Sequence, residues 1–194
     1  MPQKTKQKSI KLNLGCGHTK IPGFLGVDIN PNAEYVDKTH DLNKFPYPFK
    51  ESSVDEVYMD HVLEHLDDPL NVIQELYRIT KPNVTLRIKT PHMSCTWLHP
   101  GHKSAISTLL FDYFVPGTDD YYGNCEFKII EKKISWLRPE SPYRPNNKRS
   151  FFLKFVSSIV SSLANAHQGL CERVWCYWVG GFEEIAFTVK VIKR

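Results

Sequence analysis

The stretch LNLGCGHTKIPGFLGVDI, residues 12–29, decides which kind of fold this chain can adopt. It reads as an apolar strand, a glycine turn and a second apolar strand that ends near the acid Asp28. Glycine after a strand lets the backbone approach a ligand closely, because it carries no Cβ. This arrangement is typical of the start of a nucleotide-type cofactor site in an α/β sheet.

The link between the two strands is too short for the helix that normally follows such a turn. Residues 15–23 number nine, whereas a helical crossover needs roughly 10–12 residues. Without that helix a pyrophosphate loses its main anchor, so NAD and FAD are not expected. S-adenosylmethionine (SAM) has no phosphate and needs an acid for its ribose and an apolar slot for its adenine. Asp28 suits the ribose, and the pair Asp41 and Leu42 suits the adenine.

The order of the predicted elements indicates an α/β protein. Segments with strand character are residues 11–14, 24–29, 34–41, 53–59, 84–89, 126–135 and 183–192. Apolar spacing predicts helices over 70–80 and 152–163 and a short helix over 104–113, with a turn at 81–83. We therefore expect a Rossmann-like, mostly parallel sheet, with the first crossover helix shortened or absent and an antiparallel strand at the C-terminal end.

The bulk composition is typical of one globular domain. The chain has 194 residues, 41% of them hydrophobic, and a net charge of +4 that does not by itself favour a nucleic-acid partner. We expect a disordered tail over 1–9 and a single domain over 10–194. The five cysteines are irregularly spaced, and no apolar run approaches the roughly 20 residues of a membrane span. These features predict reduced thiols and a cytoplasmic protein.

A run of motifs resembles the class I SAM-dependent methyltransferases. In chain order the motifs are LNLGCG, GVDI, HDL, SVDEVYMDHVLEHLDDP, ELYRITKP and VTLRIKTPH. The chain is most similar to small predicted methyltransferases with a shortened first crossover and an HVLEHL segment, and the likeness is strong over residues 10–92. It implies SAM as the cofactor and residues 92–182 as the part that shapes the acceptor site.

The resemblance also implies roles for individual residues. It places Gly15, Cys16 and Gly17 at the methionine part of SAM. Cofactor contacts farther along the chain are implied for Asp28, Ile29, Asp41, Leu42, Asp60 and His61. Of these, Asp28 belongs to the ribose, Asp41 and Leu42 to the adenine, and Asp60 and His61 to the sulfonium and the acceptor.

Several histidines follow the predicted fourth strand and fifth strand. HVLEH, residues 61–65, is not the HExxH motif of zinc proteases. A second run has the pattern HxxCxxxHxxH and consists of competent zinc ligands by type: His92, Cys95, His99 and His102. Because Pro100 and Gly101 interrupt this run, we expect it to line the acceptor pocket, and we assign no metal ligand.

The predicted reaction is methyl transfer from SAM to an oxygen or nitrogen of a small molecule, such as a sugar or another metabolite. Such a transfer needs positioning and sometimes a base, and a neutral histidine suits that role. The candidate catalytic residues are His61, His92 and His102. Two alternatives stay open: an RNA or protein methyltransferase, although MDHV stands where an NPPY-type tetrad would be expected, and a non-catalytic SAM-binding module.

An apolar helical stripe follows a basic loop at residues 138–149. Its members fall at helical offsets: Phe152, Phe155, Val156, Ile159, Val160 and Leu163. We expect this stripe to pack on the sheet or at a homodimer interface. Weak association with a membrane surface, or a lipid-linked acceptor, is the alternative that the basic loop keeps open.

Overall fold

The computed structural model describes residues 9–118, 125–139, 149–178 and 180–193. All of the predicted tail except Ser9 lies outside these ranges, as does most of the basic loop at 138–149. Among the described residues, no helix is both long enough and apolar enough to cross a membrane.

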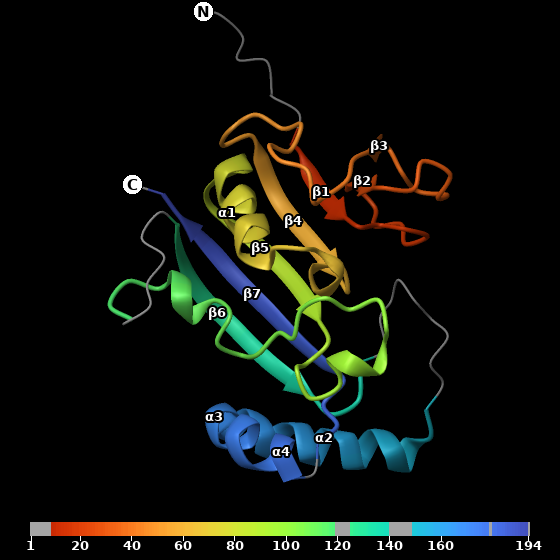
Figure 1. The fold of residues 1–194 in the computed structure, drawn as a ribbon, viewed down its shortest axis with the longest axis vertical. Coiled ribbons are helices and arrows are strands. Elements are labelled where there is room, and N and C mark those ends of the chain that lie inside the picture. The colour runs from red at the N-terminus through yellow and green to blue at the C-terminus, as the bar shows by residue number, and fades with distance from the viewer. Residues whose placement is uncertain (1–8, 119–124, 140–148, 179, 194) are drawn as a thin grey trace, which may run out of the picture.

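The described residues build one seven-stranded sheet in the order β3-β2-β1-β4-β5-β7-β6 (Figure 1). The strands are β1 (Lys11–Leu14), β2 (Leu25–Asp28), β3 (Lys38–Thr39), β4 (Val54–Asp60), β5 (Thr80–Thr90), β6 (Glu126–Ser135) and β7 (Glu184–Ile192). The first five strands pair in parallel, and β7 runs antiparallel to both β5 and β6. The predicted α/β class, the mostly parallel sheet and the antiparallel C-terminal strand are confirmed.

The helical elements follow β4, β5 and β6. They are η1 (Leu63–His65), α1 (Pro69–Ile79), η2 (Thr96–Leu98), η3 (Asp112–Phe114), α2 (Phe151–Ala166), α3 (Gln168–Leu170), the π-helical turn η4 (Cys171–Trp175) and α4 (Cys176–Trp178). The link from β1 to β2, which the structure describes throughout, contains no helix. The expected loss of the first crossover helix is therefore confirmed.

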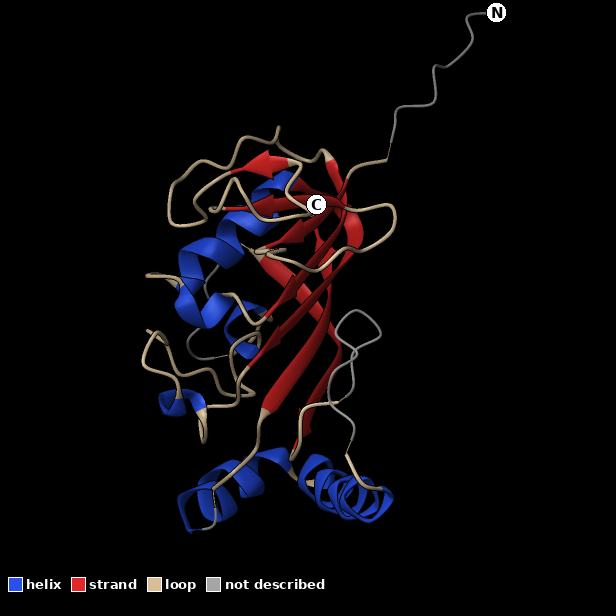
Figure 2. Ribbon diagram, turned by 90° about the vertical axis from the view of Figure 1, so that its right-hand side faces the viewer, coloured by secondary structure: helices blue, strands red, loops and turns tan. Residues whose placement is uncertain are grey.

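The core lies between the sheet and α1, which covers one of its faces (Figure 2). Helix α1 begins where Asp68 caps it by accepting a hydrogen bond from Asn71 N at 3.0 Å, with Pro69 at the first helical position. The helix buries an apolar stripe against the strands, and Leu12 and Leu14 of β1 have no exposed surface. Burial of these side chains holds the parallel strands in register.

Most strands have their carboxyl ends at the same edge of the sheet. Strands β1, β2, β4, β5 and β6 end there and β7 begins there, because β7 is the strand that runs the opposite way. Asp28, Asp60, Thr90 and Ser135 are the last residues of their strands, and Glu184 is the first residue of β7. We call this side the carboxyl edge. Helices α2 to α4 lie beyond it, next to the end of β6 (Figures 1 and 2).

Two local predictions are wrong. The expected turn at 81–83 lies inside β5, where the pairing of β5 with β4 jumps from Thr80 to Thr85 and the residues between them bulge outward. The expected helix at 104–113 contains only the start of the single turn η3. Instead, Ile106 pairs with His92 in an isolated β-bridge outside the seven strands.

Helix α2 confirms the predicted helix but not its expected packing on the sheet. Its polar side contacts β6: Ser161 Oγ accepts a hydrogen bond from Trp136 N at 3.0 Å, and Asn165 bonds both ways with the backbone of Ile134. Most of the apolar stripe faces outward instead: Phe152, Phe155, Ile159 and Leu163 are exposed, whereas Val160 packs against the core. Ser161 and Asn165 bond to the backbone at the end of β6, so a polar side of α2 meets the strand.

Candidate functional site

The glycine turn after β1 has one packed glycine and one open glycine. Both Gly15 and Gly17 have a positive φ, +65° and +47°, which disfavours any side chain. A Cβ on Gly15 would overlap the side chain of Val62, whereas a Cβ on Gly17 would meet nothing within 4 Å. The turn therefore packs against the segment after β4 and leaves the backbone of Gly17 open to a ligand.

Asp28 is held at the carboxyl edge by backbone donors. Its Oδ2 accepts a hydrogen bond from Gly17 N at 2.8 Å, and its Oδ1 accepts one from Asn30 N at 3.0 Å. Each carboxylate oxygen keeps a further lone pair, so the group can still accept the two hydroxyls of a ribose. Ile29 beside it is 64% exposed and offers an apolar surface.

Cys16 lies under this turn and is buried. Burial, with a further contribution from Asp28, raises the pKa of its thiol to about 11. The thiol donates weakly to the backbone oxygen of Tyr35 at 3.5 Å. Cys16 is thus a neutral packing residue at neutral pH, not a nucleophile.

The HDL segment joins the same site. His40 N donates to the backbone oxygen of Asp28 at 2.9 Å, which brings Asp41 and Leu42 beside the end of β2. Leu42 is buried, and its carbonyl accepts a hydrogen bond from Tyr47 Oη at 2.9 Å. Gly17, Asp28 and the segment with Leu42 thus lie near one another at the carboxyl edge. These residues fit the predicted cofactor.

Asp60 and His61, at the end of β4, belong to a group of charged residues that we call the Arg138 network. Arg138 Nη2 donates to Asp60 Oδ1 at 2.8 Å, and its Nε lies 3.4 Å from Glu184 Oε2. His61 Nε2 lies 3.2 Å from the same Glu184 oxygen. Both carboxylates are buried, so the guanidinium supplies the charge that they need. Sequence reasoning missed Arg138 and Glu184, whose distance along the chain from Asp60 gives no local signal.

His92, a predicted catalytic residue, is fully buried. Its Nε2 donates to Glu172 Oε1 at 3.1 Å, and its Nδ1 accepts from Ser94 N at 3.1 Å. Burial raises the pKa of Glu172, but hydrogen bonds from His92 and Thr108 outweigh it and leave the pKa below its ordinary value. In this arrangement His92 ties the segment after β5 to η4.

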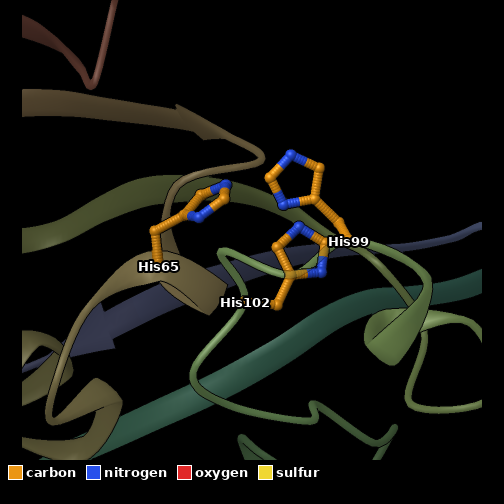
Figure 3. A group of neighbouring side chains, drawn as sticks. All are labelled: His65, His99 and His102. Carbon is orange, nitrogen blue, oxygen red and sulfur yellow. The ribbon is translucent and has the colours of Figure 1, made fainter.

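His102 lies in a different group, with His65 and His99 (Figure 3). The run HxxCxxxHxxH is therefore divided among three places. His92 contacts Glu172, and Cys95 Sγ donates to the backbone oxygen of Glu183 at 3.6 Å. Within the run only His99 and His102 lie together. The third ring of their group, His65, comes from η1.

A cleft of about 550 Å³ lies between the end of β6 and the polar side of α2. Its described basic residues are Lys132, Lys133, Arg138, Arg149 and Lys154. Hydroxyl and amide groups from α2 line the opposite wall: Ser157, Ser158, Ser161, Ser162 and Asn165. Arg138 belongs to both this cleft and the Arg138 network, which links the cleft to the end of β4.

Comparison with known proteins gives a family for the first part of the chain. Residues 12–88 match a family model described as a methyltransferase domain. A search of curated proteins finds no match.

Solved structures share the whole fold at low sequence identity. A SAM-dependent methyltransferase from Archaeoglobus fulgidus is 16% identical, with a TM-score of 0.56 over 95% of this chain and 87% of that one. A putative sarcosine dimethylglycine methyltransferase from Galdieria sulphuraria is 17% identical, with a TM-score of 0.53 over 97% and 79%. The [4+2]-cyclase SpnF is 14% identical, with a TM-score of 0.54 over 97% and 78%. These likenesses concern the fold alone.

The family match and the site agree with each other. The matched residues include the glycine turn and Asp28. They also include Asp60 and His61, which belong to the Arg138 network. The strand order places these parts along one edge of the sheet, where open α/β sheets bind their ligands. The match of residues 12–88 to a methyltransferase domain, on a fold that SAM-dependent methyltransferases share, supports an enzyme whose methyl donor is S-adenosylmethionine.

Proposed function

We propose that this methyltransferase acts on an oxygen or nitrogen of an anionic small molecule, such as a sugar that carries a phosphate or a carboxylate. The cleft between β6 and α2 carries this proposal. Among its described lining residues, five side chains are basic and one, Glu131, is acidic. Cationic side chains next to a wall of hydroxyl groups suit an acceptor that has both negative charge and hydroxyls.

The position of the cleft supports the same acceptor. It opens beside Ser135, the last residue of β6, at the carboxyl edge that also holds Asp28 and Asp60. An acceptor bound there by its anionic group could extend past Arg138 toward His61. Within this proposal residues 10–194 act as a single domain, and residues 92–182 shape the acceptor site.

His61 is the residue that we propose as the base. Bound SAM supplies an activated methyl group on a sulfonium. The imidazole lies at the end of β4, and it can take the proton that the acceptor hydroxyl or amine loses. The Glu184 carboxylate, 3.2 Å from His61 Nε2, would then stabilise the charged ring and hold its orientation. Arg138 keeps Glu184 in place.

The test is a turnover assay that measures S-adenosylhomocysteine release with matched pairs of sugars, with and without a phosphate or carboxylate. We expect turnover with the anionic members, and a KM about tenfold higher in the double variant Lys133→Gln, Lys154→Gln, with kcat little changed. Lys128→Gln, on an exposed part of β6 outside the cleft, is the matched control. Preference for the neutral sugars, or an unchanged KM in the double variant, would contradict the proposal.

One observation favours a second candidate, an acceptor carried on a membrane lipid. Helices α2 to α4 expose apolar and aromatic side chains: Phe151, Phe152, Phe155, Leu163, Leu170, Tyr177 and Trp178. Between 149 and 178 the chain has one acidic residue, the buried Glu172, and three basic residues, Arg149, Lys154 and Arg173. An apolar surface with basic neighbours and without exposed acids suits an anionic bilayer surface.

Vesicle flotation tests this second candidate. We expect the full chain to float with vesicles that contain phosphatidylglycerol and to do so less with phosphatidylcholine alone. The double variant Phe152→Ser, Phe155→Ser should lose most of the binding, with circular dichroism confirming that it folds. A stable dimer in solution that the same variant disrupts, without vesicle binding, would instead assign this surface to a second copy of the chain.

A further inference from the structure

We propose that His65, His99 and His102 form a binding site for a divalent transition-metal ion of the zinc class, with the Glu64 carboxylate balancing its charge. This site borders the Arg138 network, whose His61 Nδ1 lies 3.5 Å from Glu64 Oε1, but its three imidazoles belong to neither that network nor the cleft, and it does not depend on which acceptor the enzyme uses. The inference rests on the position of three rings, on their hydrogen bonds and on one buried oxygen atom.

The three imidazoles converge from two segments of the chain (Figure 3). His65 ends η1, whereas His99 and His102 belong to the loop after η2. Each ring offers a nitrogen atom, and these atoms lie within 4.8 Å of one another. The ring centroids are 4.7 to 5.5 Å apart. A tetrahedral zinc ion needs nitrogens about 3.4 Å apart, so small rotations of the side chains complete the site.

Hydrogen bonds fix the tautomer of two of the rings. His65 Nδ1 lies 2.9 Å from the backbone oxygen of Gly101, and His102 Nδ1 lies 2.6 Å from that of Thr96. A carbonyl oxygen only accepts, so each Nδ1 carries the proton and donates it. In the neutral rings the Nε2 atoms are then left with a lone pair, as in metal-bound histidines oriented by a backbone carbonyl. His99 is exposed and only needs to turn its ring toward the ion.

The buried carboxylate of Glu64 favours a cation at this site. This residue has no exposed surface, and Oε1 is the buried side-chain atom without a hydrogen-bond partner among the described residues. That oxygen lies 3.9 Å from His65 Nε2 and 3.9 Å from His102 Nε2. Two lone-pair nitrogens thus face a buried carboxylate oxygen, and the nearest other ring nitrogen, His61 Nδ1, lies 3.5 Å from it without forming a hydrogen bond. A positive ion among these three acceptors would remove the cost of leaving them unpaired.

The donor set points to the class of ion. Imidazole nitrogens suit zinc, copper, iron and nickel, whereas magnesium and calcium prefer oxygen ligands. The site would also join η1 to the loop that carries His99 and His102. Since Val62, one residue before η1, packs on Gly15 of the glycine turn, a bound ion would steady the wall beside the cofactor site.

Cobalt titration of the metal-free full chain tests the site. We expect one equivalent of Co²⁺ to give the visible absorption of a tetrahedral ion with nitrogen and oxygen ligands, and one equivalent of Zn²⁺ to displace it. The double variant His65→Asn, His102→Asn should bind at least tenfold more weakly. His167→Asn, an exposed histidine outside the cluster, is the matched control and should bind like the wild type.

Two further readouts keep the test decisive. Zinc should raise the melting temperature of the wild type and of His167→Asn but not that of the double variant, whose fold is checked by circular dichroism. A near-ultraviolet band from thiolate bound to cobalt would show that cysteines hold the ion instead. That band, binding that survives in the double variant, or no stoichiometric binding by the wild type would overturn the proposal.

Discussion

Two groups of buried carboxylates and histidines lie close together near the end of β4, and they differ in one component. In the Arg138 network the carboxylates of Asp60 and Glu184 share a guanidinium. In the cluster around Glu64 the carboxylate oxygen Oε1 has imidazoles nearby but no hydrogen-bond partner. An arginine thus neutralises the first group, whereas the buried oxygen of the second group has three imidazoles near it and no hydrogen-bond partner among the described residues.

We infer a different role for each group from this difference. A network that is complete without a ligand can hold its geometry in the free enzyme, which suits residues that must orient an acceptor. A group that lacks a counter-charge is costly until something binds, which suits a metal site.

Removal of the shared guanidinium should have the largest effect on folding. Arg138→Met leaves Asp60 and Glu184 buried without a cation, and loss of one partner of a buried ion pair costs about 3–5 kcal/mol. Urea denaturation measures this change in the free energy of unfolding. As a control, Lys103→Met breaks the exposed pair with Asp67 and should cost at most about 1 kcal/mol. Similar losses in the two variants would show that the network is not a buried unit.

His61→Asn should affect catalysis and leave cofactor binding intact. If the imidazole accepts the proton of the acceptor, its loss lowers kcat by roughly 10²- to 10⁴-fold. The affinity for SAM, measured by calorimetry, should change little. A variant that retains its kcat would show that His61 is not the base.

Glu64→Gln should act in opposite directions on the two states of the metal site. In the metal-free protein it replaces a buried carboxyl group whose Oε1 has no hydrogen-bond partner, and we expect the free energy of unfolding to rise by about 1 kcal/mol. In the presence of zinc it removes the balancing charge, so metal affinity should fall. Thermal unfolding with and without zinc compares the two states. A variant that is destabilised in both would mean that the Glu64 carboxylate is satisfied without an ion.

The substitution Glu172→Gln should change stability least, because hydrogen-bond donors of the protein already satisfy the Glu172 carboxylate. Its pKa is below the ordinary value of 4.5, through hydrogen bonds from His92 and Thr108 that outweigh its burial. A lowered pKa in the folded state adds stability above pH 4.5 that is lost as the pH falls through the folded value. The wild type should therefore lose more stability between pH 6 and acid than Glu172→Gln does. Equal pH slopes in urea denaturation would argue against this role.

The sequence predicted those parts of the molecule that depend on neighbours along the chain. The glycine turn, the acid after β2 and the strands β1, β4, β6 and β7 follow from local pattern and turn chemistry. The missing first helix follows from the length of the link between β1 and β2. Helix α2 also follows from its apolar spacing.

The missed features depend on contacts between distant residues. Arg138 lies 78 residues from Asp60, and Glu184 lies 123 residues from His61, so no local pattern connects them. Most of the α2 stripe faces outward, whereas Ser161 and Asn165 meet the backbone at the end of β6. The sequence did not predict the histidine cluster, because its third ring, His65, comes from η1 and not from the run of residues 92–102.

We expect the open glycine turn and Asp28 to bind SAM without the usual first helix. Calorimetric titration of SAM into the wild type and into Asp28→Ala tests it most directly. We predict a single site with micromolar affinity that weakens at least tenfold, about 1.4 kcal/mol, in the variant. Absence of binding to the wild type at millimolar SAM, or equal affinity in the two proteins, would contradict the account.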